Sequence, residues 1–174
     1  MKLDLIEILL NVGRSMAYPV NEPGLRLDEE ASTTDYMGSL RFTNSGGALL
    51  VEGRISSRLR MVCSRCLRQF EQSISLSIEE QFAIQIHGNR STGRSVTVQE
   101  EDENPDAGRI FEGDWFNLTE MLRQHSLLEI PIQPLHDENC SGLCPHCGQD
   151  LNIKSCSCRE DDMPSPFAVL AKFR

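Results

Sequence analysis

Residues 48–78 read ALLVEGRISSRLRMVCSRCLRQFEQSISLSI, and they establish the fold class. Apolar and polar residues alternate from Ser57 to Val62 and again from Phe70 to Ile78, which is the pattern of half-buried strands. The segment Cys63-Ser64-Arg65-Cys66 lies between the two runs, so we expect it at a corner that joins two strands. The stretch therefore predicts a β-rich body.

The flanking sequence extends this body. A strand from Tyr36 to Phe42, the turn signal Asn44-Ser45-Gly46-Gly47 and the apolar run from Ala48 to Ile55 predict a β-hairpin. The run from Leu3 to Leu10 suits a short helix or an edge strand. After Ile86 the sequence HGNRSTGRSVTVQEEDENPDAG has no large apolar residues except valine, which favours a mobile loop.

A helix is predicted to begin at Asn117, which can cap the first turn while Glu120 returns the bond as a capping box. It must end before Pro131. Its expected apolar stripe consists of Leu118, Met121, Leu122, Leu127 and Leu128. A second helix is expected at the end of the chain, with Ser165 as its cap and Pro166 in its first position.

Five of the seven cysteines lie between residues 140 and 158, and their spacing indicates a metal site. Cys144-Pro145-His146-Cys147-Gly148 has the C-P-x-C-G form of a zinc knuckle, in which Gly148 can take a positive φ and let backbone N–H groups face the sulfurs. We expect one structural Zn²⁺ per chain. The expected ligands are Cys144, Cys147, Cys156 and Cys158, with Cys140 as the alternative ligand and His136 and His146 in reserve.

Disulfides, an iron–sulfur cluster and simple buried thiols are the other possible roles of these cysteines. The cysteine number is odd and MKLDLIEILL shows no secretory signal or membrane span, so we expect a cytoplasmic protein whose thiols stay reduced. The spacing from Cys140 to Cys147 also occurs in radical enzymes with iron–sulfur clusters, but too little chain follows it for their barrel. Simple buried thiols are the remaining alternative.

The pair Cys63 and Cys66 could be a redox couple, half of a second metal site, or a contributor to the C-terminal one. A redox couple normally opens a helix, whereas this pair lies between strands. Sharing the C-terminal metal would make two of its five cysteines redundant. We therefore expect an independent corner.

These observations define an α+β chain with three parts. Residues 1–133 form the β-rich N-terminal body, an antiparallel sheet or partly open barrel with one main helix at about 117–129. Residues 134–162 form a small C-terminal zinc-knuckle module. Residues 163–174 form a docking helix.

Charge and motifs limit the function. The net charge of −9 implies that any contact with RNA is local or made through a basic partner. Basic residues gather around the first cysteine pair, at Arg54, Arg58, Arg60, Arg65 and Arg68, where they form either a solvated strand face or an RNA site. None of the four histidines lies in a recognisable catalytic motif, and surplus cysteines favour a closed structural site. We expect no enzyme activity.

Three blocks of sequence together resemble one family. They are MVCSRCLRQFEQSISLSIEEQF, PIQPLHDENCSGLCPHCGQDLNIKSCSC and SPFAVLAKF. In them the chain is similar to the YceD family, bacterial and plastid proteins associated with accumulation of large-subunit ribosomal RNA. Some members retain the first cysteine pair without the C-terminal cluster, which would place the function near residues 63–70.

The resemblance implies a non-enzymatic factor in 23S ribosomal RNA accumulation and large-subunit assembly. Its partners would be the large-subunit ribosomal RNA precursor, a basic large-subunit ribosomal protein, or both, with no membrane and no small-molecule substrate. The residues expected to bind RNA or a partner are Arg58, Arg60, Cys63, Arg65, Cys66 and Arg68. The alternative is a zinc-bearing adaptor between proteins, unconnected with ribosomes.

Overall fold

Two antiparallel sheets dominate the computed structural model, which describes residues 1–89, 93–99, 109–112 and 115–158. The larger sheet is open, with the order β2-β4-β5-β6-β7 and with β3 paired to β5. Its strands are β2 (Ser15–Glu22), β3 (Ser32–Thr33), β4 (Tyr36–Asn44), β5 (Ala48–Val62), β6 (Gln69–Asn89) and β7 (Gly93–Gln99). The smaller sheet has the order β1 (Lys2–Asp4), β9 (Trp115–Asn117) and β8 (Phe111–Glu112). The expected β-rich fold is confirmed, and the open sheet replaces the barrel alternative.

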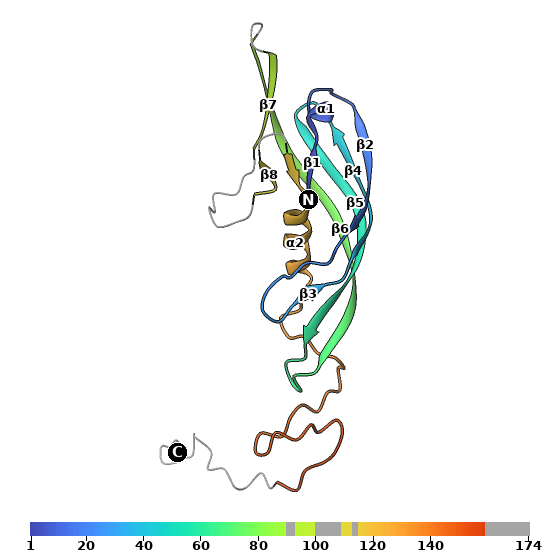
Figure 1. Ribbon diagram of the computed structural model, residues 1–174, viewed down its shortest axis with the longest axis vertical. Coiled ribbons are helices and arrows are strands. Elements are labelled where there is room, and N and C mark those ends of the chain that lie inside the picture. The colour runs from blue at the N-terminus through green and yellow to red at the C-terminus, as the bar shows by residue number, and fades with distance from the viewer. Residues whose placement is uncertain (90–92, 100–108, 113–114, 159–174) are drawn as a thin grey trace, which may run out of the picture.

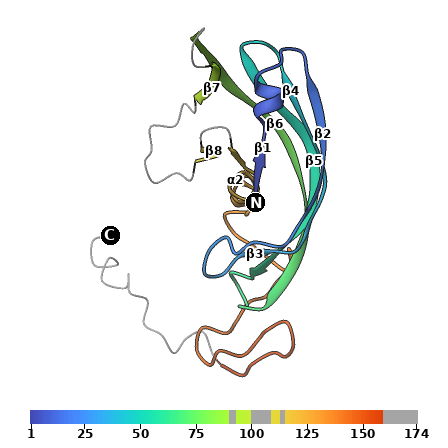
Figure 2. The ribbon, with the colours of Figure 1, turned by 45° about the horizontal axis from the view of Figure 1, so that its top comes forward.

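The long hairpin of β5 and β6 is the spine of the molecule. Its register runs from Ala48 opposite Ala83 to Val62 opposite Gln69, so residues 63–68 form its tip. Along β5 the odd-numbered residues from Val51 are buried or partly buried, while Arg58 and Arg60 on the other face are exposed. The sheet is strongly curved, and Figure 2 shows α2 (Leu118–Leu128), β1 and β8 on its inner side.

The core fills the inner side of this curve. Phe42, Phe82, Phe111 and Phe116 pack edge to face, with ring centroids 5.0 to 6.3 Å apart. Such packing of aromatic edges against faces adds to the stabilisation from burying the rings. The short helix α1 (Ile6–Leu9) is fixed at its end by Asn44, whose side-chain amide donates to the carbonyls of Ile8 and Leu9. The run Leu3–Leu10 thus contributes both a strand end and a helix.

Helix α2 follows the prediction in part. The Asn117 side chain accepts a hydrogen bond from the Glu120 backbone N–H, as expected for the cap. The reciprocal half of the capping box is wrong, because the Asn117 N–H bonds to the Ile110 carbonyl and the Glu120 carboxylate pairs with Arg123.

The buried face of α2 also differs from the expected stripe. Leu118, Met121 and Leu122 are buried, but Ser126 completes the stripe and Leu128 is exposed. The helical repeat favours position 126 over 128. The Ser126 hydroxyl forms a hydrogen bond with the buried Tyr36 hydroxyl at 2.8 Å. Because its hydroxyl has a partner, serine can occupy this buried position.

The mobile loop expected after Ile86 is wrong over residues 87–89 and 93–99. These residues complete β6 and form β7, an edge strand whose sequence contains the β-branched run Val96-Thr97-Val98. Edge strands need fewer large apolar residues because they pair on one side only. The rest of the predicted loop, residues 90–92 and 100–108, and the predicted helix at 163–174 lie outside the described residues.

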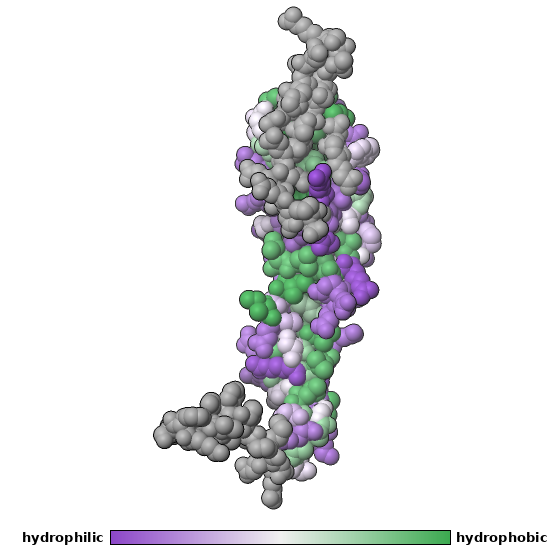
Figure 3. Space-filling view, turned by 90° about the vertical axis from the view of Figure 1, so that its left-hand side faces the viewer, coloured by the Kyte–Doolittle hydropathy of each residue, from purple (hydrophilic) through white to green (hydrophobic). Residues whose placement is uncertain are grey.

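The cysteine-rich segment, residues 134–158, lies beyond the tip of the β5–β6 hairpin, at one end of the long axis of the molecule (Figure 1). In Figure 3, the face on the side of α2 shows hydrophobic residues between hydrophilic ones. Leu128 and Ile132 are among the exposed large apolar residues near the end of α2. Within the described residues, no helix is long and apolar enough to cross a membrane.

Candidate metal centres

The first candidate centre, here called the hairpin cluster, consists of Cys63, Cys66, His136 and Cys140. Cys63 and Cys66 come from the hairpin tip, whereas His136 and Cys140 come from the segment after α2. Their donor atoms all lie within 4.8 Å of one another. The three sulfurs are buried and pack against the side chains of Phe70, Leu135 and Leu143.

The second candidate centre, here called the knuckle cluster, consists of Cys144, Cys147, Cys156 and Cys158. Its four sulfurs also lie within 4.8 Å of one another, but only Cys144 is buried. Gly148 has φ +71°, in keeping with the positive φ expected at that position. The structure thus brings together the four cysteines proposed as ligands and places the alternative, Cys140, in the hairpin cluster.

The two Cys-x-x-Cys turns have the same backbone hydrogen bonds. The N–H of Leu67 donates to the Cys63 carbonyl at 2.9 Å, and the N–H of Gly148 donates to the Cys144 carbonyl at 2.9 Å. The N–H of each first cysteine donates to a carbonyl five residues further along the chain. Cys63 donates to the Arg68 carbonyl at 2.9 Å, and Cys144 donates to the Gln149 carbonyl at 2.8 Å. The residue after each second cysteine is left-handed, with φ 59° at Leu67.

Each cluster holds one thiol that ionises readily. Burial acts to raise the pKa of Cys63, but the hydrogen bond with His136 and nearby backbone N–H groups outweigh it and lower the pKa to about 5. Backbone N–H groups of Cys147 and His146 lower the pKa of Cys144 to about 6. The hydrogen bond with Cys147, followed by burial, raises the pKa of Cys158 to about 12. A cation bound in either cluster would therefore have to displace protons from the thiols whose pKa is raised, which are Cys66 in the first cluster and Cys156 and Cys158 in the second.

Two of the arginines proposed to bind RNA are engaged within the protein. Arg65 donates from a guanidinium nitrogen to the Cys140 carbonyl at 2.9 Å, and Arg68 pairs with Asp150 at 3.1 Å. Both bonds fasten the cysteine-rich segment to the hairpin tip. Arg58 and Arg60 instead project from the outer face, where they share Glu71 and their side chains are 59% and 60% exposed.

Cys63 and Cys66 lie apart from the knuckle cluster, in keeping with the expected independence from that site, but they do not stand alone, because Cys140 and His136 join them. Their sulfurs face this cluster, so a surface partner would meet the neighbouring arginines rather than these thiols. His136, expected only as a reserve ligand of the C-terminal zinc, lies in the hairpin cluster. The spacing His136-x-x-x-Cys140 beside the second Cys-x-x-Cys was the signal available in the sequence.

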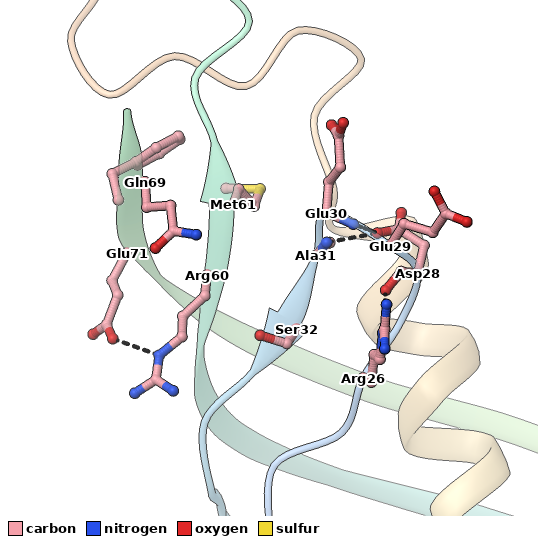
Figure 4. Close-up of a pocket in the computed structure, with 11 residues that line it drawn as sticks. Arg26, Asp28, Glu29, Glu30, Ala31, Ser32, Arg60, Met61, Gln69 and Glu71 are labelled. Carbon is pink, nitrogen blue, oxygen red and sulfur yellow. Dashed lines mark hydrogen bonds and ion pairs between the residues drawn. The ribbon is translucent and has the colours of Figure 1, made fainter. Parts of the chain in front are cut away.

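A hollow of about 540 Å³ lies next to the hairpin tip (Figure 4). It is lined by residues 26 and 28–32, by Arg60 and Met61 of β5, and by residues 69–71 of β6. Asp28, Glu29, Glu30 and Glu71 outnumber its two arginines. This excess of carboxylates suits a basic side chain and would repel a phosphate.

One family model and several curated proteins match this chain. The family model described as "Large ribosomal RNA subunit accumulation protein YceD" matches residues 51–174. Proteins described as uncharacterized from Mycobacterium bovis and Mycobacterium tuberculosis are 29% identical over 112 residues, which cover 64% of this chain. The chain spans about half the length of these curated relatives, since the match covers 49% of each. No solved structure matches the chain.

Proposed function

Because this chain belongs to the YceD family of large ribosomal RNA subunit accumulation proteins, we propose that it is a non-enzymatic factor that supports accumulation of 23S ribosomal RNA and assembly of the large ribosomal subunit. The observation that carries the proposal is the family match over residues 51–174. The matched region contains most of β5, the hairpin tip, β6 and both cysteine clusters.

The donors of the knuckle cluster support a structural zinc ion there. Four cysteine ligands arranged as a tetrahedron are typical of closed structural zinc sites, whereas catalytic zinc keeps one position open for water or substrate. Cys144, Cys147, Cys156 and Cys158 would hold the ion. When bound, it would cross-link the two ends of the loop from residue 147 to residue 156, in keeping with a binding role rather than a catalytic one.

The distribution of charge supports two kinds of contact. Exposed Arg58 and Arg60 on the outer face of the hairpin offer a local positive site for ribosomal RNA, despite the net charge of −9. The carboxylates around the hollow suit a basic ribosomal protein. RNA would contact the outer face of the hairpin, and the basic partner would contact Asp28, Glu29 and Glu30 at the hollow. Arg60 and its ion-pair partner Glu71 also line the hollow, so they mark the border between the two contacts.

The test is depletion of this protein in its own cells, followed by re-supply. The ratio of large- to small-subunit ribosomal RNA and the sucrose-gradient profile are measured at each stage. We expect depletion to lower the large-subunit RNA and the mature large subunits, and re-supply of the wild-type chain to restore both. An unchanged ratio would contradict the proposal and favour the zinc-bearing adaptor.

A further inference from the structure

We propose that the hairpin cluster is a second zinc site of this chain, with Cys63, Cys66, His136 and Cys140 as ligands. The zinc ion bound there clamps the cysteine-rich segment onto the hairpin tip. This inference concerns metal content and local order, so it is independent of the ribosomal role. It also exceeds the expectation of one zinc per chain, which was made for the knuckle cluster alone.

The distances between donor atoms fit a single tetrahedral ion. With Zn–S bonds of about 2.3 Å and Zn–N bonds of about 2.0 Å, ligand atoms of a tetrahedron are roughly 3.5–3.8 Å apart. The Cys63 and Cys140 sulfurs are 3.9 Å apart, and His136 Nδ1 lies 3.4 Å from the Cys63 sulfur. The Cys66 sulfur is also 3.4 Å from Nδ1. The imidazole nitrogen therefore faces two sulfurs at once, as a shared ion requires.

The similarity of the two turns gives independent support. Cys63-x-x-Cys66 and Cys144-x-x-Cys147 have the same pair of backbone hydrogen bonds and a left-handed residue directly after the second cysteine. At position 67 that conformation is taken by leucine, a residue that adopts it at a cost of roughly 1–2 kcal/mol. A turn that keeps this geometry without glycine needs a stabilising interaction, and a bound ion provides one.

The geometry of the cluster excludes a simpler role, a disulfide bond between the two segments. The Cys63 and Cys140 sulfurs are 3.9 Å apart, well beyond the roughly 2.05 Å of a disulfide bond. Asn152 donates from its side-chain amide to the Cys140 sulfur at 3.5 Å, a contact of the kind that orients metal ligands.

The clamp adds to the few other contacts that hold the cysteine-rich segment on the hairpin tip. These include hydrogen bonds from Ser64 to the Pro134 carbonyl and between Arg65 and the backbone of Cys140 and Leu143, the exposed pair of Arg68 and Asp150, and a small apolar patch around Phe70. Exposed hydrogen bonds of this kind contribute little net stability. An ion with ligands from both segments adds a link whose binding energy is also folding energy.

The decisive measurement is zinc per chain by native mass spectrometry and elemental analysis, after dialysis against a mild chelator. We expect two ions in the full chain and one in each of the variants Cys140→Ser and Cys147→Ser. Because one serine replaces one proposed ligand in each cluster, each variant is the control for the other. One ion in the full chain, unchanged in Cys140→Ser, would overturn the second site without affecting the knuckle site.

A second pair of variants guards against misfolding. His136→Ala should lose one ion, whereas His136→Cys, which restores a fourth donor, should regain it. Hydrogen exchange of residues 134–140 should rise at least tenfold in His136→Ala and Cys140→Ser, but not in Cys147→Ser. Retention of both ions in His136→Ala, with slow exchange of residues 134–140, would refute the ligand role and the clamp.

Discussion

Leu67 and Gly148 hold equivalent positions in the two Cys-x-x-Cys turns, and both are left-handed, with φ 59° and +71°. Leucine is strained in this conformation because its Cβ approaches the following carbonyl oxygen, while glycine is not. The Leu67 side chain is 65% exposed, so burial offsets little of that strain. A Cβ placed on Gly148 would meet no atom within 4 Å, which leaves conformation as the only constraint there.

Opposite outcomes are expected at these two positions. Leu67→Gly should raise the free energy of unfolding by up to about 1 kcal/mol, because relief of strain exceeds the added entropy of the unfolded chain. The measurement is denaturant unfolding in saturating zinc. An equal or lower midpoint for Leu67→Gly would show that the leucine is not strained.

At the second position, Gly148→Ala should weaken zinc retention by the knuckle cluster. A conformational cost of roughly 1–2 kcal/mol corresponds to a loss of affinity of roughly 5- to 30-fold. Competition with a chromogenic chelator measures this loss. Gly47→Ala is the matched control, since Gly47 has ordinary φ and an added Cβ there meets nothing within 4 Å. Equal zinc retention in both variants would contradict the conformational role of Gly148.

Helix α2 connects the sheet to the cysteine-rich segment, so its two ends constrain both. Asn117 ends β9 and caps the helix at the same time, with its side chain bonded to Glu120 and its N–H bonded to Ile110. One residue thus joins the small sheet to the helix. Near the C-terminal end of the helix, a buried hydrogen bond between two hydroxyl groups links Ser126 to Tyr36 of β4.

Removal of the cap should destabilise the whole body. Asn117→Ala should lower the free energy of unfolding by about 1 kcal/mol, the usual effect of losing an N-cap, with a fall in Tm of roughly 2–4 °C. Asn117→Asp keeps the acceptor and should stay close to the wild type. Scanning calorimetry compares the three proteins; equal Tm values for Asn117→Ala and the wild type would show that the cap contributes nothing.

The elements that could be predicted from sequence are those with a local signal. The alternation of apolar and polar residues predicted β5 and β6, because one face of each strand is buried along most of its length. The cap at Asn117 could be predicted because capping depends on residues close by in the sequence. The strand β7 was missed because an edge strand needs few large apolar residues. The joining of His136 and Cys140 to Cys63 could not be derived, since contacts between segments about 70 residues apart depend on the tertiary fold.

At the scale of the whole molecule, the curved sheet separates two surfaces. The inner side is covered by α2 and the small sheet, while the outer side of β5 and β6 carries polar and charged residues. Beside the tip, Arg65 and Arg68 hold the cysteine-rich segment through Cys140 and Asp150. Charge reversal of these two arginines would therefore disturb the clamp as well as any partner, so the outer-face arginines give the cleaner test.

The double variant Arg58→Gln and Arg60→Gln should reduce co-sedimentation with precursors of the large subunit. Loss of two phosphate contacts would also reduce the steepness of the plot of log binding constant against log salt concentration by about two. The fold should persist, because exposed ion pairs contribute only about 0–1 kcal/mol. Arg14→Gln is the control, since it removes a positive charge from another exposed ion pair, with Glu7, that belongs to neither proposed contact. Equal co-sedimentation of the wild type and both variants would exclude the outer face as the RNA site.

The hairpin cluster also constrains the order of events during translation. Cys63 and Cys140 are 77 residues apart, so the first thiol pair is made well before its partners leave the ribosome. At roughly 5–20 residues per second, this interval is roughly 4–15 s. The sheet can form within that time, but the hairpin site stays half complete until the last ligand emerges. Metal capture at this site is therefore a late step of synthesis, and a nascent chain truncated before residue 140 would lack it.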